Sequence, residues 1–157
     1  MNFICIMSLA ATLALPSQRM EIAIRVAGDG MPNCQSYRPD GTVGPCLPAF
    51  TVRRGGEING SSLSGHITFT SGAAVRLNED EFALLAGHEI AHYYLGHKSK
   101  ALANELAADR LGAELACRAG YDPIVGATLF RHLRASKTHL ARDARRALVL
   151  SVGCAKT

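Results

Sequence analysis

The sequence has no tryptophan, and aromatic residues make up only 6% of its 157 residues. Nucleic-acid-binding proteins usually combine basic patches with aromatic side chains that stack on bases, and because this combination is missing we expect no nucleic-acid partner. No apolar run reaches the roughly 20 residues that a membrane-spanning helix requires. With 48% hydrophobic and 19% charged residues, the chain has the composition of one globular domain and is too short for two full-sized enzyme domains.

Basic residues are also missing before the first apolar run, residues 3–15 (FICIMSLAATLAL). The run has the length of the apolar core of a secretory signal peptide, in which a positive charge normally comes first. The alternative is a buried first strand or helix of the domain itself. We predict an atypical signal peptide at residues 1–14 and a single domain at residues 15–157.

Removal of that signal peptide would take Cys5 with it and leave four cysteines, which allow three pairings. The most natural pairs are Cys34 with Cys46, which closes a loop rich in Pro and Gly, and Cys117 with Cys154, which joins two late segments. Disulfides indicate an oxidising compartment, so we expect an exported protein, periplasmic or secreted. A cytoplasmic location is expected instead if the apolar run is structural.

Short strands are expected in the first half of the chain. Alternating polar and apolar residues predict strands at 21–26, 50–53 and 66–70, with a long loop at 28–48.

Helices are expected in the second half. Asn78 is followed by three acidic residues, which favours a helix that begins there and ends near Leu95. Further helices are predicted at 101–119, from Pro123 onward and at 139–152. Strands followed by helices indicate an α+β fold in which a small, mainly antiparallel sheet packs on helices.

The helix predicted at 78–95 contains His88-Glu89-Ile90-Ala91-His92, an HExxH pattern. Residues four apart lie on one face of a helix, so both imidazoles can reach one metal ion. Glu89 is rotated about 100° from His88 and can deprotonate a metal-activated water. A catalytic zinc site uses three protein ligands and leaves a fourth position for water, so a third ligand is needed.

Two candidates for the third ligand follow the motif. His97 lies five residues after His92 rather than six, which does not fit the HExxHxxGxxH arrangement; its alternative role is a cation near a helix C-terminus. Glu105 fits better, because Asp109 follows one turn later on the same face. One carboxylate can then bind the metal while the other orients a ligating histidine. The alternative for this pair is an exposed acidic face.

Residues 58–148 resemble the gluzincin metallopeptidases of family 48, which include HtpX-like membrane proteases, CaaX prenyl proteases and BepA-like periplasmic proteases. The resemblance is carried by INGSSLSGHITFTSGAAVRLNEDEFALLAGHEIAH, where small residues, an edge strand and a short helix precede the metal motif, and by NELAADRLGAELACRAGYDP. A weaker match is Thr138-His139 with Arg145 six residues later, where Leu140 replaces the family's proline.

The resemblance implies a zincin-like fold with one zinc ion per chain. It assigns His88, His92 and Glu105 as zinc ligands. Glu89 would be the general base and later the proton donor, and Asp109 would orient a ligand histidine.

The resemblance also implies two features of the cleft. His139 and Arg145 would approach it, His139 as a catalytic residue and Arg145 as an accessory that stabilises an oxyanion or regulates access. An edge strand, where an extended substrate pairs by β-augmentation, would consist of His66, Ile67, Thr68, Phe69 and Thr70.

We therefore expect a zinc-dependent endopeptidase that hydrolyses peptide bonds in exported or misfolded proteins. The alternatives are a non-catalytic zinc-stabilised interaction module and an intracellular regulatory metalloprotease. Residues 131–146 carry six of the 17 Lys and Arg residues and one acid. This stretch predicts a solvated helix face, or contact with an acidic membrane surface or a partner. The sequence does not predict the oligomeric state.

Overall fold

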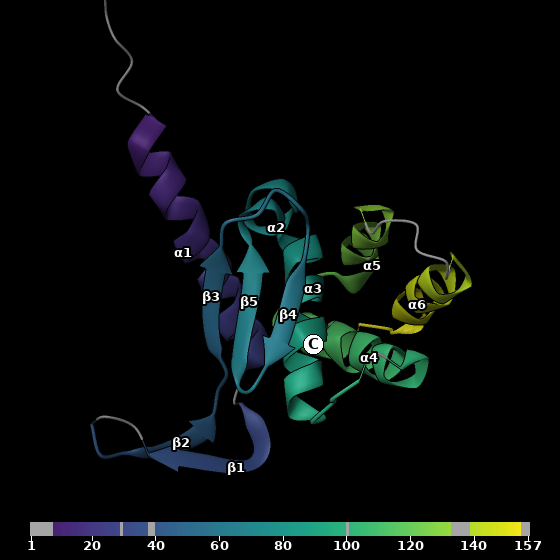
Figure 1. Ribbon diagram of the computed structural model, residues 1–157. Helices are drawn as coiled ribbons and strands as arrows, with labels where there is room; N and C mark the ends of the chain where they lie inside the picture. Colours follow the sequence, from purple (N-terminus) through teal and green to yellow (C-terminus); the bar gives the residue numbers. More distant parts are fainter. Residues whose placement is uncertain (1–7, 29, 38–39, 100, 133–138, 155–157) are drawn as a thin grey trace, which may run out of the picture.

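The computed structural model describes residues 8–28, 30–37, 40–99, 101–132 and 139–154, and these form an α+β fold (Figure 1). Its elements in chain order are α1 (Ser8–Ala27), β1 (Met31–Tyr37), β2 (Val43–Cys46), β3 (Ala49–Arg53), β4 (Gly60–Leu63), β5 (His66–Thr70), α2 (Ser71–Arg76), α3 (Glu79–Tyr94), α4 (Leu102–Arg118), α5 (Pro123–Gly126), the 3-10 helix η1 (Ala127–His132) and α6 (His139–Ser151).

The main sheet has three strands in the order β3-β5-β4. β5 pairs in parallel with β3 (Phe50 opposite Ile67) and antiparallel with β4 (Ser62 opposite Ile67). The prediction that His66–Thr70 is an edge strand is therefore wrong, because both backbone edges of β5 are already hydrogen-bonded. In the described part of the chain, β4 pairs with β5 alone, so β4 is an edge.

The strand predicted at 21–26 is also wrong, because these residues form the last turns of α1. The buried side chains are Ile22, Ala23 and Val26, while Ile24 is 53% exposed. That spacing follows the 3.6-residue period of a helix rather than the two-residue period of a strand. This face of α1 packs on α3 and belongs to the main hydrophobic core.

A buried arginine joins α1 to the end of α2. The Nε and Nη2 atoms of Arg19 donate hydrogen bonds to the carbonyl oxygens of Ala74 (2.9 Å) and Leu77 (2.7 Å). These are carbonyls that a helix C-terminus leaves without partners of its own. The guanidinium also lies over the Phe82 ring, 5.3 Å from its centroid.

Helix α3 is the central helix of the fold and begins as predicted. The Asn78 side chain accepts a hydrogen bond from the Glu81 backbone N–H (2.8 Å), and the Glu81 carboxylate accepts one from the Asn78 backbone N–H (3.0 Å). This capping box satisfies two backbone donors at the helix start. The residues from Glu81 to Ala91 are all buried, so this part of α3 is enclosed on all sides by the rest of the fold.

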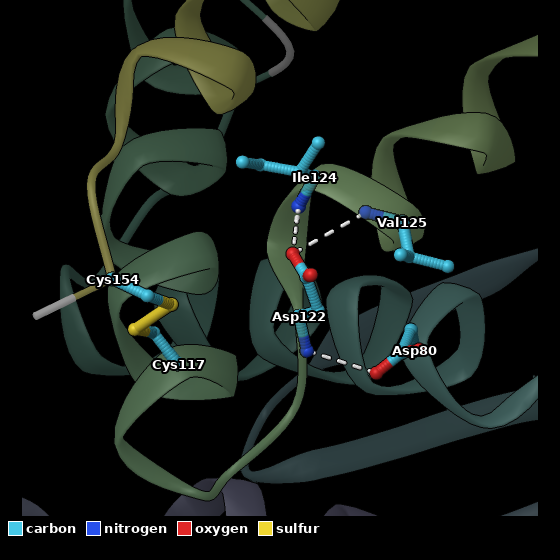
Figure 2. The surroundings of a disulfide bond; sticks show 6 residues. All are labelled: Asp80, Cys117, Asp122, Ile124, Val125 and Cys154. Carbon is cyan, nitrogen blue, oxygen red and sulfur yellow. Dashed lines mark hydrogen bonds between the residues drawn. A yellow bond between two sulfur atoms is a disulfide. The ribbon is translucent and has the colours of Figure 1, made fainter. Parts of the chain in front are cut away.

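Both predicted disulfides are present. Cys34–Cys46 links β1 to β2, so the loop expected at 28–48 is a hairpin tied by a disulfide. Cys117–Cys154 links α4 to the segment that follows α6 (Figure 2). Paired cysteines of this kind are typical of proteins in an oxidising environment.

The third predicted helix is short. The Asp122 carboxylate accepts hydrogen bonds from the backbone N–H groups of Ile124 and Val125, and its own backbone N–H donates to Asp80 (Figure 2). This cap starts α5, which soon becomes the 3-10 helix η1. The bond to Asp80 fixes the start of α5 against α3.

The segment predicted as a signal peptide, residues 1–14, lies partly outside the described residues. Residues 8–14 form the first turns of α1, which project away from the sheet (Figure 1). No helix within the described ranges is long and apolar enough to span a membrane.

Candidate metal centre

The two helices that carry the predicted ligands pack directly on each other. His88 and His92 lie on α3, and Glu105 and Asp109 lie one turn apart on α4. At the crossing, a Cβ atom added to Gly112 would lie only 2.6 Å from the backbone nitrogen of His88. Because glycine leaves this space empty, the two backbones touch, and the carboxylates of α4 reach the imidazoles of α3.

Three side chains converge on one point between the helices. The Nε2 atoms of His88 and His92 are 3.0 Å apart. The Glu105 carboxylate lies 3.6 Å from His88 Nε2 through one oxygen and 3.5 Å from His92 Nε2 through the other. One ligand atom from each residue lies within 4.8 Å of the other two, so this group can hold a metal ion.

The donor set fits a small divalent ion. Two imidazole nitrogens that each bind a tetrahedral ion at about 2.05 Å lie about 3.3 Å apart, which is close to the 3.0 Å between His88 and His92. An ionised Asp109 can only accept, so the proton of this contact is on His88 Nδ1, and in the neutral ring His88 Nε2 is the unprotonated acceptor. The lone pair of His88 Nε2 therefore faces the point shared with His92 and Glu105, where a divalent cation can bind.

Asp109 and Arg145 hold the ligand side chains in place through hydrogen bonds and an ion pair. Asp109 is 3% exposed, and its Oδ1 accepts the hydrogen bond from His88 Nδ1 (2.8 Å). Arg145, from α6, donates through Nε to Asp109 Oδ2 (2.6 Å) and through Nη2 to Asp109 Oδ1 (2.9 Å). Arg145 Nη1 also lies 3.0 Å from Glu105 Oε2. One guanidinium therefore fixes both Glu105 and Asp109.

These contacts keep the carboxylates ionised. The pKa of Glu105 is lowered to about 2, chiefly by its polar contact with His92, with further help from His88 and Arg145. Burial alone would raise the pKa of Asp109, but its hydrogen bonds with His88 and Arg145 outweigh burial and lower it. Burial would in turn lower the pKa of Arg145, and Asp109 outweighs that effect and raises it. The site thus holds two carboxylates and one permanent cation near neutral pH.

Glu89 follows His88 on α3 and packs against the sheet. It is 7% exposed, and its side chain fills the space beside Gly60, where a Cβ atom would lie 2.8 Å from Glu89 Cγ. Its charge also raises the pKa of Arg145. The HExxH carboxylate is therefore held next to the edge strand β4.

His97 is placed outside the converging group. Its Nδ1 lies 3.0 Å from Nδ1 of His92, the ring nitrogen that does not face the metal position. Burial and the neighbouring His92 lower the pKa of His97, which keeps its ring neutral near pH 7. The cationic role considered from the sequence is thus disfavoured.

Other predicted residues have different outcomes. The side chain of His139 lies outside the described part of the structure, so its catalytic role remains a prediction. Within the basic stretch 131–146, Arg131 lies 3.4 Å from Glu81 and Arg145 is directed into the metal site. The stretch is therefore not one uniform solvated face.

Several residues that shape the site were missed by sequence reasoning. Gly60, Gly87 and Gly112 allow the close approaches. His97 was considered as a ligand or a cation, but its contact with His92 was not foreseen. Gly87 and Gly112 lie inside sequence patterns that are otherwise helical. Because glycine weakens a helix, its presence there could have indicated a close packing contact.

Comparison of the chain with models of known protein families, with curated proteins and with solved structures finds no match.

Proposed function

We propose that this chain is a zinc-dependent endopeptidase. The observation that carries the proposal is the convergence of His88, His92 and Glu105 on one point, with Glu89, the residue after His88, packed against the edge strand β4. Two imidazoles and one carboxylate suit zinc, and three protein ligands are the number found in catalytic rather than structural zinc sites. A bound zinc ion supplies Lewis acidity, which lowers the pKa of a water molecule toward ~7 and polarises a peptide carbonyl.

Glu89 performs the proton transfers in this proposal. It accepts a proton from the attacking water as the water oxygen bonds to the carbonyl carbon, and it delivers that proton to the amide nitrogen as the C–N bond breaks. Arg145 and Asp109 act through the ligands in this proposal. They hold Glu105 and His88 in place, so that the geometry exists before substrate binds.

The substrate in this proposal is an extended polypeptide that pairs with β4. Among the described strands, β4 has one unpaired edge and lies against α3 beside Glu89. Pairing through main-chain hydrogen bonds accepts many sequences but requires an unfolded segment. Together with the two disulfides, this supports misfolded or unfolded exported proteins as the substrate class.

The test compares Glu89→Gln with the wild-type protein in zinc binding and in hydrolysis of an unfolded protein such as casein. Glutamine keeps the shape of the side chain but cannot take up a proton, so zinc should remain bound while hydrolysis is lost. Glu114→Gln, an exposed residue on α4, is the matched control and should cleave normally. Undiminished cleavage by Glu89→Gln would overturn the mechanism.

Removal of zinc by a chelator distinguishes the proposed endopeptidase from a non-catalytic zinc-binding module. Casein cleavage by the wild-type protein should stop when zinc is removed and return when zinc is added. Tight zinc binding by a wild-type protein that cleaves no unfolded substrate would instead assign a non-catalytic, zinc-stabilised interaction module.

A further inference from the structure

The end of α3 folds back so that two histidines face each other. The backbone N–H of Gly96 donates to the Tyr93 carbonyl (3.2 Å), and that of His97 donates to the His92 carbonyl (3.0 Å). Gly96 has a φ of +64°, which glycine adopts without strain. These two bonds with a left-handed glycine between them form a complete Schellman motif.

A Schellman motif brings the residue after the glycine against the residue five positions earlier. That contact is usually hydrophobic, but here the two residues are His97 and His92. Their ring centroids are 5.1 Å apart in an edge-to-face arrangement, and their Nδ1 atoms are 3.0 Å apart. The helix cap therefore directs one imidazole nitrogen at another.

The chemistry of two facing imidazole nitrogens restricts both rings. A hydrogen bond between them needs one N–H donor and one unprotonated acceptor. If His92 binds the metal through Nε2, its proton must be on Nδ1, so His92 is the donor and His97 Nδ1 is the acceptor. His88 obeys the same rule, with Asp109 as its acceptor.

We infer that His97 is a positioning residue for zinc, which accepts the Nδ1 proton of His92 and so holds that ring in the orientation and tautomer needed for binding. This inference rests on the zinc site proposed above. His97 is not itself a ligand, because its nearest nitrogen faces the Nδ1 side of His92 and the converging group contains His88, His92 and Glu105. Each ligand histidine thus has its own acceptor: a carboxylate for His88 and an imidazole for His92.

The first test measures zinc affinity by competition with a chelator. His97→Ala removes the acceptor and should weaken zinc binding about 10- to 100-fold, the usual cost of losing such a partner. In His97→Asn, the amide oxygen is attached to Cγ as Nδ1 is, so it should restore binding close to the wild-type value. In His97→Gln the oxygen is one bond further away and should not. Lys98→Ala, exposed in the same loop, is the matched control.

The second test reads the proton directly. In the zinc-loaded wild-type protein, nuclear magnetic resonance of histidine ring nitrogens should show slowly exchanging Nδ1 protons on both His88 and His92. His97→Ala should lose protection of the His92 proton only, because Asp109 still protects His88. Loss of both signals would indicate a general loosening of the site and would overturn the specific role of His97.

The outcomes separate this inference from the proposed function. If the wild-type protein binds zinc and His97→Ala binds it equally well, the role of His97 is refuted while the endopeptidase proposal stands. If cobalt substituted for zinc changes its coordination number in both His97→Ala and His97→Asn, His97 is a ligand, and the inference is again wrong. If the wild-type protein binds no zinc, both proposals fail.

Discussion

Gly87 on α3 and Gly112 on α4 face each other with their backbones in contact, at the point where the two helices cross. The contact is one residue away from His88 and three residues away from Asp109. A methyl group at either position would meet backbone atoms, which cannot move aside as a flexible side chain can. The short distance between the two ligand-bearing helices therefore depends on glycine at both positions.

The first prediction follows from this crossing. Gly112→Ala should lower the free energy of unfolding by about 1–3 kcal/mol through overpacking, despite the gain of about 1 kcal/mol in helix propensity. It should also weaken zinc binding, because Glu105 moves away from the imidazoles. Denaturant unfolding and chelator competition measure the two effects. Glu114→Ala, an exposed change on the same helix, should alter neither; equal zinc affinity in Gly112→Ala and wild type would contradict the prediction.

Arg145 carries the second prediction, because it is the cation shared by Asp109 and Glu105. Arg145→Met should lower the free energy of unfolding of the zinc-free protein by about 3–5 kcal/mol, the usual cost of leaving a buried charge without its partner. Arg145→Lys should not restore the loss, since one ammonium group cannot reproduce a bidentate guanidinium contact. Arg146→Met, at the exposed neighbouring position, is the control. Full recovery in the lysine variant would show that only charge matters.

The sequence predicted the helices better than the sheet. The α3 start could be read from Asn78 and the acids after it, because capping is a local interaction. Six residues at 21–26 could not distinguish a strand from a helix, since both periods place Ile22 and Val26 on one face. β4 has no β-branched or aromatic residue and exists through its pairing with β5, which no local pattern reveals.

In the candidate site, too, the features set by local sequence were predicted and those set by tertiary packing were not. The spacing within HExxH and between Glu105 and Asp109 is helical, so these residues could be assigned to two faces from sequence alone. Which strand lies next to Glu89 depends on the order of the strands in the sheet. Because that order cannot be read from the sequence, the substrate-binding edge was assigned to β5 instead of β4. The contacts of Arg145 depend on where α6 packs, which is a tertiary feature.

The disulfide between Cys117 and Cys154 gives the third prediction, because it ties the end of α6 to α4 and thereby helps hold Arg145 in place. Changing both cysteines to serine should lower the free energy of unfolding by about 3–4 kcal/mol in the chain-entropy estimate and should also weaken zinc binding. The matched control is the double serine variant of Cys34 and Cys46, which lie in the hairpin. It should lose stability but keep zinc affinity; if both pairs affect zinc equally, the disulfide has no specific link to the site.

The fourth prediction concerns Glu81 and the loss of folding stability at acid pH. Glu81 is 1% exposed, and burial alone would raise the pKa of its carboxylate. Its hydrogen bonds with Thr128 (2.6 Å) and the Asn78 backbone, with the charges of His132 and Arg131, outweigh burial and lower the pKa below the usual 4.5. A lowered folded-state pKa means that the unfolded chain binds a proton first as the pH falls.

The stability that Glu81 contributes is therefore complete above about pH 5 and is lost as the pH falls through its lowered folded-state pKa. Urea unfolding from pH 7 to pH 3 should show a steeper loss of stability in the wild-type protein than in Glu81→Gln, which starts less stable but has no such proton to bind. Glu79→Gln removes an exposed acid from the same helix turn and should keep the steep wild-type dependence. Parallel curves for wild type and Glu81→Gln would mean that the acid sensitivity comes from other carboxylates, with Glu105 and Asp109 next to be tested because their pKa values are also lowered.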